Sequence, residues 1–349
     1  MTSTTFTDLL SRLIATPSFS REEHVTAELL ADFIHNQGIA FRRKHNNIWA
    51  ANLHFDPAKP TILLNSHHDT VKPNSAYTLD PFEPLVRDGK LYGLGSNDAG
   101  AALVSLLAAF LHFYKRENLT HNLLFAATAE EEISGLNGVE SILPELGDIA
   151  LAIVGEPTLF QMAVAEKGLL VLDCTAQGKA GHAAREEGVN AIYEAMSDIE
   201  WFRSYRFPKV SPTLGPVKMS VTVIQAGTQH NVVPAECRFT VDVRCTDAYS
   251  HEELLDIIRS QVRAEVVPRS MRLRPSAIPM EHPIVQAGLV MGLSAYGSPT
   301  SSDQALMPFT SIKIGPGDSA RSHSADEFVY LHEIEQGIAG YIRLLEQVL

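Results

Sequence analysis

The stretch Leu123–Gly135, LLFAATAEEEISG, begins as a run of apolar and small residues and ends in three consecutive carboxylates, Glu130, Glu131 and Glu132. The apolar run is typical of a β-strand that is buried on both faces. Three adjacent acids at the end of such a strand repel one another and resist desolvation. The stretch therefore predicts either a site for a cation or a solvated acidic turn, and other segments must decide between them.

Two further predicted strands end at residues that can bind a cation. TILLNS (61–66) runs directly into His67, and IALAIVGEPT (149–158) ends in Glu156. Because helical patterns lie between these strands, we expect parallel strands joined by right-handed crossovers. Sites in open sheets of this kind form at the carboxyl ends of the strands, which would bring His67, Glu156 and the glutamates together.

The rest of the chain alternates between helical and strand-like patterns. Pro17 ends a first helix, and Ser20 with Glu23 predicts a capping box for a second helix that runs to Gly38. A hairpin is predicted to turn at Asp88-Gly89. The other predicted helices cover residues 99–114, 136–143, 190–202, 252–266, 283–293 and a final stretch from 331, and the other predicted strands include 48–53, 168–179, 217–227, 236–244 and 311–314.

The pattern changes at about Lys167. From there, long strands alternate between apolar and polar residues, which is typical of an antiparallel sheet with one exposed face. We therefore predict an α/β fold with a mostly parallel central sheet flanked by helices, into which a small α+β domain is inserted. The predicted boundaries are 1–166 and 276–349 for the discontinuous first domain and 167–275 for the inserted domain.

Composition and charge narrow the class of protein. The chain has 349 residues and a net charge of −13, which argues against nucleic acid or an anionic membrane as partner. Its three cysteines have no CxxC spacing, so they indicate neither a zinc cluster nor a disulfide framework. The N-terminus lacks the pattern of a signal peptide, and no run of 18 apolar residues occurs. We expect a cytoplasmic protein.

The candidate ligands are of the types that bind divalent metals. Two histidines with three carboxylates suit two ions with one carboxylate bridging them, and zinc, cobalt and manganese all accept such ligands. A further carboxylate that binds no metal can act as a base, which is a design for hydrolysis. Since adjacent glutamates cannot point the same way, one should bind metal and the other act as base. The candidates are His67, Asp98, Glu131, Glu132, Glu156 and His323.

Seven motifs occur in an order that resembles one family. Together they are similar to the di-zinc aminoacyl hydrolases, which include acetylornithine deacetylase, succinyl-diaminopimelate desuccinylase, aminoacylase and carboxypeptidases of the glutamate-releasing type. The nearest likeness is to shorter acetylornithine-deacetylase-like proteins that act on N-acyl-ornithine or N-acetylcitrulline. The motifs are HHDTV (67–71), GSNDAG (95–100), TAEEEISG (128–135), VGEPT (154–158), AGHAA (180–184), NVVPAECRFTVDVR (231–244) and GPGDSARSH (315–323).

The resemblance implies a role for each matching residue of the first domain. Glu131 would be the general base that takes a proton from water and later gives it to the leaving amine. Asp69 would orient His67, and the Asp98-Ala99 peptide bond would be cis. Glu130 would support the site in place of the family's usual aspartate. The implied ligands of the two zinc ions (cobalt or manganese being possible) are His67 and Glu156 at one ion, Glu132 and His323 at the other, and Asp98 at both.

The resemblance also implies that the inserted domain is a lid through which a homodimer forms. His182 would reach the partner's active site and stabilise the oxyanion of the tetrahedral intermediate. Substrate binding would involve Arg244, Asn231 and Lys167. We add His230, which stands where relatives often carry a small or amide residue. His68, next to the candidate ligand His67, would be a ligand only if the strand register slipped.

The implied reaction is hydrolysis of the amide between an acetyl or succinyl group and the α-amine of an amino acid, with N-acyl-ornithine or N-acetylcitrulline favoured, as in arginine biosynthesis. The residues leave the acyl group open, since a succinyl pocket needs a second cation for which Lys167, Arg185 and Arg321 are candidates. Two alternatives remain: a dipeptidase or carboxypeptidase of the same family, and a non-catalytic metal-binding protein with this fold.

Overall fold

Strand β6 (Asn122–Thr128) is formed by the apolar run that precedes the three glutamates. It pairs in parallel with β3 (Thr61–His67) and antiparallel with β2 (Asn47–Ala51). Every residue of β6 and β3 is buried, as expected for strands that are covered on both faces. The carboxyl ends of these two parallel strands meet at one edge of the sheet.

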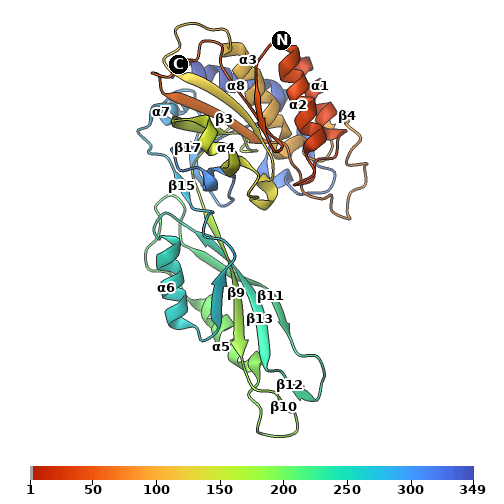
Figure 1. The fold of residues 1–349 in the computed structure, drawn as a ribbon, viewed down its shortest axis with the longest axis vertical. Helices are drawn as coiled ribbons and strands as arrows, with labels where there is room; N and C mark the ends of the chain where they lie inside the picture. The colour runs from red at the N-terminus through yellow and green to blue at the C-terminus, as the bar shows by residue number, and fades with distance from the viewer. Residues whose placement is uncertain (1–2) are drawn as a thin grey trace. The chain divides into compact units, whose positions relative to one another are not determined.

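The computed structural model describes residues 3–349 and divides the chain into two compact units (Figure 1). The first unit comprises Met1–Val164, Ala277–Tyr296 and Ser302–Leu349, and the second comprises Ala165–Ser276 and Gly297–Ser301. The sequence analysis placed the boundaries after residues 166 and 275. The roles given there to the two domains stay predictions.

The central sheet has the order β1-β2-β6-β3-β7-β17-β8-β15, with β16 paired to β8. Strands β6, β3, β7 and β17 run parallel, so the prediction of a mostly parallel sheet between helices is confirmed. Strand β8, which the sequence analysis did not predict, pairs antiparallel with β17. The bounds of the remaining strands are β1 (Arg42–Lys44), β7 (Ile149–Val154), β8 (Met162–Glu166), β15 (Ser276–Ala277), β16 (Ala295–Ser298) and β17 (Ser311–Lys313).

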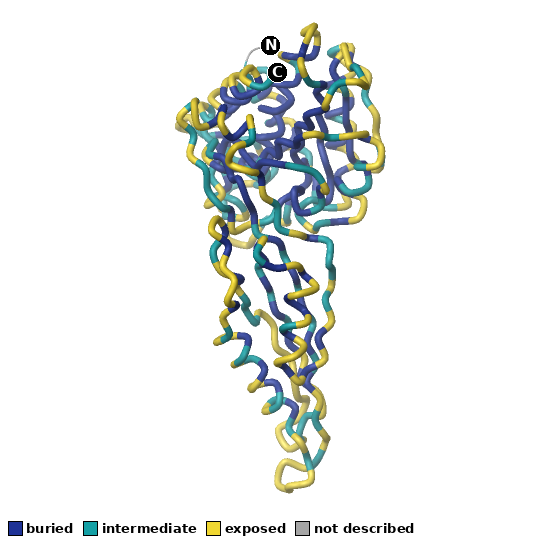
Figure 2. The backbone as a smooth tube through the Cα atoms, turned by 90° about the vertical axis from the view of Figure 1, so that its left-hand side faces the viewer, coloured by how far each residue is buried: buried dark blue, intermediate teal, exposed yellow. Residues whose placement is uncertain are grey.

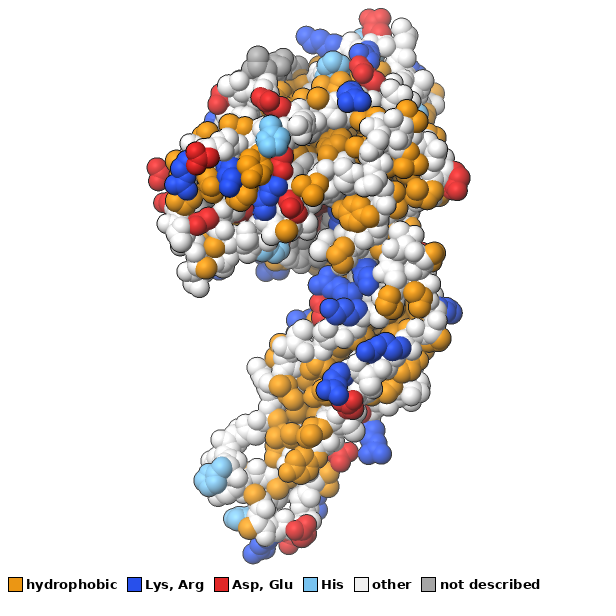
Figure 3. Space-filling model, turned by 180° about the vertical axis from the view of Figure 1, so that it is seen from behind, with side chains coloured by type: hydrophobic (Ala, Val, Ile, Leu, Met, Phe, Trp, Pro, Cys, Tyr) orange, Lys and Arg blue, Asp and Glu red, His pale blue; other side chains and the backbone are white. Residues whose placement is uncertain are grey.

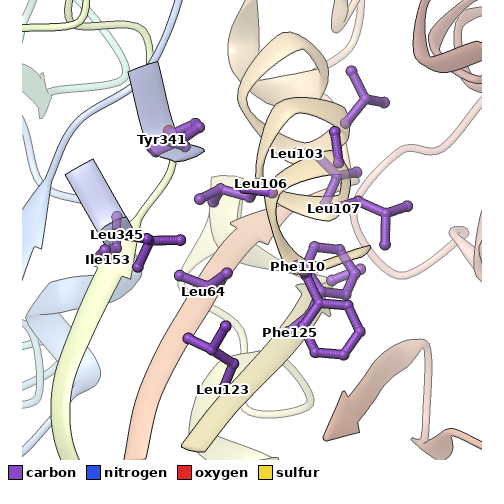
Figure 4. Close-up of a cluster of buried hydrophobic side chains, with 14 of the residues drawn as sticks. Leu64, Leu103, Leu106, Leu107, Phe110, Leu123, Phe125, Ile153, Tyr341 and Leu345 are labelled. Atoms are coloured by element: carbon purple, nitrogen blue, oxygen red, sulfur yellow. The ribbon is translucent and has the colours of Figure 1, made fainter. Parts of the chain in front are cut away.

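Helices cover both faces of this sheet because successive side chains of each strand point to opposite faces. Leu64 and Phe125 pack in one core with Phe110 and Leu345 (Figure 4), whereas Leu124 packs on the other face. Figure 2 shows buried residues gathered in the interior of the first unit. The helices on the first face are α1 (Ser3–Ile14), α2 (His24–Asn36), α3 (Ala101–Phe113), α7 (Pro283–Val290) and α8 (Leu331–Glu346), and the second face carries α4 (Val139–Leu146).

Helix α3 is apolar on all sides. With the preceding turn, the segment Ser96–Phe113 is long and apolar enough to cross a membrane, but 83% of it is buried inside the protein. A helix that is hydrophobic all round and enclosed by protein is a core helix. Here α3 lies between the sheet and α8 and carries the turn that contains Asp98 at its N-terminal end.

The predicted capping box at the start of α2 is wrong. Ser20 lies too early in the chain, since the helix begins at His24, and its hydroxyl instead donates to Asp69 Oδ2 at 2.7 Å. Glu23 is fully buried and accepts hydrogen bonds from the Asn46 side chain (2.8 Å) and the Glu130 backbone N–H (3.2 Å). Hydrogen bonds to ionised carboxylates are about twice as strong as neutral ones, so these partners outcompete the local cap.

A small three-stranded sheet lies next to the turn that contains Asp98. The predicted hairpin is present: β4 (Leu85–Arg87) and β5 (Lys90–Tyr92) pair antiparallel around Asp88 and Gly89, which both have positive φ. Strand β18 (Phe328–Tyr330) adds to β5, with Phe328 opposite Tyr92. The sheet therefore joins the chain just before the Asp98 turn to the chain just after His323.

The second unit is an antiparallel sheet with the order β11-β13-β9-β14. Residues of β9 alternate between buried and partly exposed positions, and the buried face packs against α5 and α6. The predicted helix 252–266 ends at Gln261, because the backbone turns extended at Val262 and the valine-rich segment that follows pairs with β9. The elements are β9 (Gly168–Gln177), β10 (Gly181–His182), α5 (Ala191–Ser204), β11 (Lys218–Ala226), β12 (Val232–Val233), β13 (Glu236–Cys245), α6 (His251–Gln261) and β14 (Glu265–Pro268).

Candidate metal centre

The turn after β6 separates the roles of the three glutamates. Glu130 has a left-handed backbone (φ 55°), and its carboxylate folds back to accept hydrogen bonds from the backbone N–H and the side chain of Asn137. The space it fills exists because Gly135 has no side chain: a Cβ there would lie 1.9 Å from Glu130 Oε2. Glu130 thus stabilises the turn, whereas Glu131 faces His67 at the end of β3 and Glu132 faces His323.

Asp69 holds this turn against the end of β3. Its two carboxylate oxygens accept the backbone N–H groups of Glu131 (3.0 Å) and Glu132 (3.2 Å). His67 Nδ1 lies 3.0 Å from the Asp69 carbonyl oxygen and 3.4 Å from Asp69 Oδ1, so it donates its proton on this side. His67 Nε2 faces the site, and in the neutral ring that donates from Nδ1 its lone pair would be available to a metal ion. This is the carboxylate–histidine arrangement that orients a metal-binding imidazole.

His323 approaches from the opposite side of the site. It has a left-handed backbone (φ 58°), and its Nε2 lies 3.0 Å from Glu132 Oε2 and 3.6 Å from Asp98 Oδ2. The hydrogen bond to Glu132 raises the pKa of His323 to about 9. Glu132 and His323 are therefore brought together from segments 191 residues apart.

Asp98 lies between two groups of candidate ligands. Its Oδ1 is 3.4 Å from His67 Nε2, and its Oδ2 faces His323. Glu156 Oε1 is 3.8 Å from His67 Nε2, and Glu131 Oε2 is 4.0 Å from the same atom. The peptide bond Asp98-Ala99 is cis, as the resemblance implied. The structure thus brings all six candidate residues of the first unit to one place.

Buried negative charge dominates the electrostatics of this place. Burial, together with the neighbouring carboxylates, raises the pKa of Glu156 to about 8 and the pKa of Glu131 well above its usual range. Burial and the Asp98 charge likewise raise the pKa of Glu132, although its hydrogen bond from His323 acts in the opposite direction. Like charges this close favour protonation, and a bound cation would relieve their repulsion.

The donor set fits divalent metal ions. One potential ligand atom from each of His67, Asp98 and Glu132 lies within 4.8 Å of the others. Imidazole nitrogen and carboxylate oxygen are the ligands that zinc and similar metals take in catalytic sites. The two oxygens of Asp98 face different histidines, which is the geometry of a carboxylate that can bridge two ions.

His68 is directed away from the candidate centre. Its Nε2 donates to the Asn46 carbonyl oxygen at 2.9 Å, and its Nδ1 accepts from the Thr26 hydroxyl at 3.0 Å. Burial lowers the pKa of His68 to about 4, so the ring is neutral at pH 7. The ring connects the end of β3 to α2 and to the β1–β2 turn.

The sequence analysis missed Glu327, a carboxylate that lies behind the Asp98 turn. Glu327 is 1% exposed and accepts backbone N–H groups from Asn97 (2.8 Å), Asp98 (2.9 Å) and Gly95 (3.2 Å). Burial and the Asp98 charge raise its pKa to about 8. The sequence offered one indication that Glu327 belongs to the site, its position four residues after His323. That indication is weak, because an acid that precedes a short strand is usually solvent-exposed.

The five remaining predicted residues belong to the second unit. Arg244 forms a bidentate ion pair with Asp242 (2.9 and 3.1 Å), and Lys167 Nζ donates to the Pro216 carbonyl oxygen at 2.9 Å. His182 is exposed on β10, where its Nδ1 accepts the Ala184 backbone N–H at 3.1 Å. Asn231 and His230 are exposed beside β12, which pairs with β10.

A family model and two curated relatives match most of the chain. The model of peptidase family M20/M25/M40 matches residues 63–347. The chain is 28% identical over 373 residues to the acetylornithine deacetylase of Proteus mirabilis (strain HI4320), covering 95% of this chain and 93% of that one. It is 27% identical over 375 residues to the succinyl-diaminopimelate desuccinylase of Stenotrophomonas maltophilia (strain R551-3), covering 98% of both.

Solved structures share the fold at lower sequence identity. The M20 family metallo-carboxypeptidase Sso-CP2 from Sulfolobus solfataricus superposes with a TM-score of 0.78 at 16% identity, covering 98% of this chain and 99% of that one. The YXEP protein of Bacillus subtilis, described as a dinuclear metal binding peptidase of the M20 family, gives a TM-score of 0.74 at 16% identity, covering 99% and 98%.

Proposed function

Since the chain belongs to peptidase family M20/M25/M40, and is therefore a member of a family of hydrolases, we propose that it is a metal-dependent amidohydrolase that removes an acetyl or succinyl group from the α-amine of an amino acid. N-acyl-ornithine and N-acetylcitrulline are the favoured substrates. The named relatives that are deacetylases and desuccinylases support this class of reaction.

The observation that carries the proposal is the arrangement around Asp98. Two zinc ions, or cobalt or manganese, would be held by His67 with Glu156 and by His323 with Glu132, with Asp98 shared. Such ions, when bound, acidify water and polarise the amide carbonyl. Four of these six residues, His67, Glu131, Glu132 and Glu156, follow parallel strands, and Asp98 and His323 approach them from two other loops.

Glu131 is the proposed general base. Its carboxylate lies 4.0 Å from His67 Nε2 but is assigned to neither group of ligands. A mostly buried carboxylate among other carboxylates has a raised proton affinity, so Glu131 can take a proton from the attacking water and return it to the leaving amine. Asp69 fixes the position of Glu131 through the backbone N–H that it accepts.

The second unit would supply the remaining substrate contacts. We assign Arg244, Lys167, Asn231 and His230 to substrate binding and His182 to the oxyanion. Arg244 is a planar donor that suits a carboxylate, and its present partner Asp242 holds it in one orientation. Arg321 is likewise paired, with Glu333 at 2.7 Å through both terminal nitrogens, so it would have to give up this ion pair to bind a succinyl group.

A substrate panel tests the proposal. Zinc-loaded protein is assayed for kcat/KM on N-acetylornithine, N-succinylornithine, N-acetylcitrulline and a simple dipeptide. We expect one acyl-amino acid to be preferred by about 100-fold or more, equivalent to roughly 2.7 kcal/mol in the transition state. Slow and equal rates on all four would contradict the proposed substrate class.

The alternative within the family is a dipeptidase or carboxypeptidase. The carboxypeptidase Sso-CP2 has the same fold, so the fold is compatible with this alternative. A preference for the dipeptide in the same panel would establish it. A non-catalytic metal-binding role is the alternative of another class. Stoichiometric metal content without hydrolysis of any panel member would favour it.

The protein's assembly and location belong to the same proposal. We propose a homodimer formed through the second unit, supported by the edge strand β11, where Val223 is 46% and Ile224 54% exposed. Tyr193 and Met196 on α5 extend this apolar surface, and Figure 3 shows hydrophobic side chains gathered on one face of the unit. Three free, buried cysteines are compatible with the proposed cytoplasmic location.

A further inference from the structure

The turn that contains Asp98 is held from behind by a single carboxylate. Glu327 Oε1 accepts the backbone N–H groups of Asn97 at 2.8 Å and Asp98 at 2.9 Å, and Oε2 accepts that of Gly95 at 3.2 Å. The side chain is almost completely buried, with 1% of its surface exposed. Three donors from one short turn therefore converge on one buried carboxyl group.

The turn has a particular need for this support. Gly93 and Gly95 both have positive φ, so the chain enters the turn through residues that place few restrictions on the backbone. Buried backbone N–H groups must be paired, and within this turn Glu327 pairs three of them. A carboxylate suits the task because both of its oxygens accept, whereas an amide offers one accepting oxygen.

Glu327 is itself held by rigid structure. Its carbonyl oxygen accepts the Gly93 backbone N–H at 3.0 Å, and the next residues form β18, which pairs with β5. The same segment carries His323 four residues earlier. One short stretch of chain thus supplies a candidate ligand on the open side of Asp98 and an anchor on its buried side.

We propose that Glu327 is a positioning residue that fixes the orientation of the Asp98 carboxylate and thereby sets the affinity of the centre for divalent metal. This inference rests on the metal centre of the proposed function but not on its substrate. The anchor acts on the backbone of Asp98 itself, so a shift of the turn would move both of the oxygens that face His67 and His323.

The test uses full-length Glu327→Gln and Glu327→Asp proteins. The dissociation constant for Zn²⁺ is measured by competition with a chelator, and the unfolding temperature is measured on metal-free protein. We expect Glu327→Gln to weaken zinc binding by about 10- to 100-fold, the range typical of partners that orient metal ligands. Glu327→Asp keeps the carboxyl group but shortens the side chain, so the zinc affinity of this variant should fall between those of Glu327→Gln and the wild type.

Asp198→Asn is the matched control. Asp198 is 4% exposed and also accepts two backbone N–H groups, those of Arg263 (3.2 Å) and Ala264 (2.8 Å), but it lies in the second unit. This change should lower the unfolding temperature and leave zinc affinity unchanged. A purely structural role for Glu327 would give the same result as this control.

The possible results distinguish failure of this inference from failure of the proposed reaction. Wild-type zinc affinity in folded Glu327→Gln protein would overturn the proposal, and so would failure of both Glu327 variants to fold while Asp198→Asn folds. Because zinc affinity is measured without substrate, an inactive panel with intact zinc binding would reject the proposed reaction and leave this inference standing. Wild-type protein that binds no divalent metal would overturn both.

Discussion

At the scale of single residues, adjacent glutamates have different partners. Glu132 is hydrogen-bonded to His323, whereas Glu131 is assigned to neither group of ligands. Glu131→Gln should therefore lower kcat by about 10²- to 10⁴-fold, the usual contribution of a general base. The change is isosteric, so the metal content should remain that of the wild type. Steady-state kinetics together with elemental analysis of the dialysed protein would measure both.

The neighbouring change serves as its control. Glu132→Gln should lower the metal content as well as the rate, because it removes a proposed ligand and the partner of His323. Equal loss of metal in the two variants would contradict the division of roles between Glu131 and Glu132.

The two adjacent histidines give a second contrast. His67→Ala should remove a proposed metal ligand and reduce the metal-to-protein ratio. His68→Ala should keep that ratio but destabilise the fold by about 1–3 kcal/mol, since the buried Asn46 carbonyl and Thr26 hydroxyl lose their partner. The metal-to-protein ratio and the free energy of chemical unfolding are measured for both variants. A loss of metal in His68→Ala protein alone would indicate that His68, and not His67, is the ligand.

Residues of the candidate site were predictable where a strand end or a motif marked them. His67, Glu156 and the glutamates follow apolar strands, so their convergence follows from parallel topology. Glu23 and Glu327 were not predictable in this way, because they act on backbone N–H groups more than 100 residues away. Sequence spacing carries no information about such partners.

At the scale of elements, the turn from β6 depends on Gly135. Gly135→Ala should push the Glu130 carboxylate from its place and shift the two following glutamates. Displacements of about 1 Å in active sites can lower rates by about 100-fold, and overpacking costs roughly 1–3 kcal/mol of stability. We therefore expect kcat/KM to fall by about 100-fold and the free energy of unfolding to fall by roughly 1–3 kcal/mol.

Gly147→Ala is a control for a loss of stability away from the candidate site. Unlike Gly135, Gly147 has a positive φ (74°), and a Cβ there would meet no atom within 4 Å. The change should cost roughly 1–3 kcal/mol of stability through backbone strain and leave kcat/KM unchanged. Full activity in Gly135→Ala protein would show that Glu130 does not support the site.

The types of the long elements could be predicted because their periodicity is strong, as in β3, β6 and α3. The short strands β8 and β14 could not, since four or five residues beside a helix or a domain boundary carry too little pattern. The capping box predicted at Ser20 failed for a different reason. The Ser20 hydroxyl donates to Asp69, which is distant in sequence, and not to the start of the helix.

At the scale of the whole molecule, the proposed dimer makes a test of His182 possible. If His182 acts in the partner's site, then His182→Ala and Glu131→Gln homodimers are both inactive, but a hybrid dimer has one intact site. Mixing the two variants under conditions that exchange subunits should restore activity. Half of a random mixture is hybrid, so recovery should approach about a quarter of the wild-type rate.

The corresponding control mixes two variants that damage the same side of the site, Glu131→Gln and Glu132→Gln. In these hybrids both sites remain damaged, and no recovery is expected. Recovery in this control, or its absence in the His182 mixture despite subunit exchange shown by mass spectrometry, would contradict the proposed dimer. The apolar surface of β11 and α5 is where that dimer should form.

The identity of the substrate was beyond prediction from the sequence, for a physical reason. Discrimination between an acetyl and a succinyl group depends on where one or two cations lie relative to the scissile amide. Arg244 and Arg321 are each paired with a carboxylate of the chain itself, and no sequence pattern indicates such pairing in advance.

The most direct test of the central claim is the location of bound metal by anomalous diffraction at the zinc edge from crystals of the zinc-loaded protein. The account predicts two peaks roughly 3.5–4 Å apart, as in other two-metal sites, with one oxygen of Asp98 near each. His67 and Glu156 should lie about 2.0–2.2 Å from one peak, and His323 and Glu132 at that distance from the other. A single peak, or peaks away from Asp98, would contradict the account.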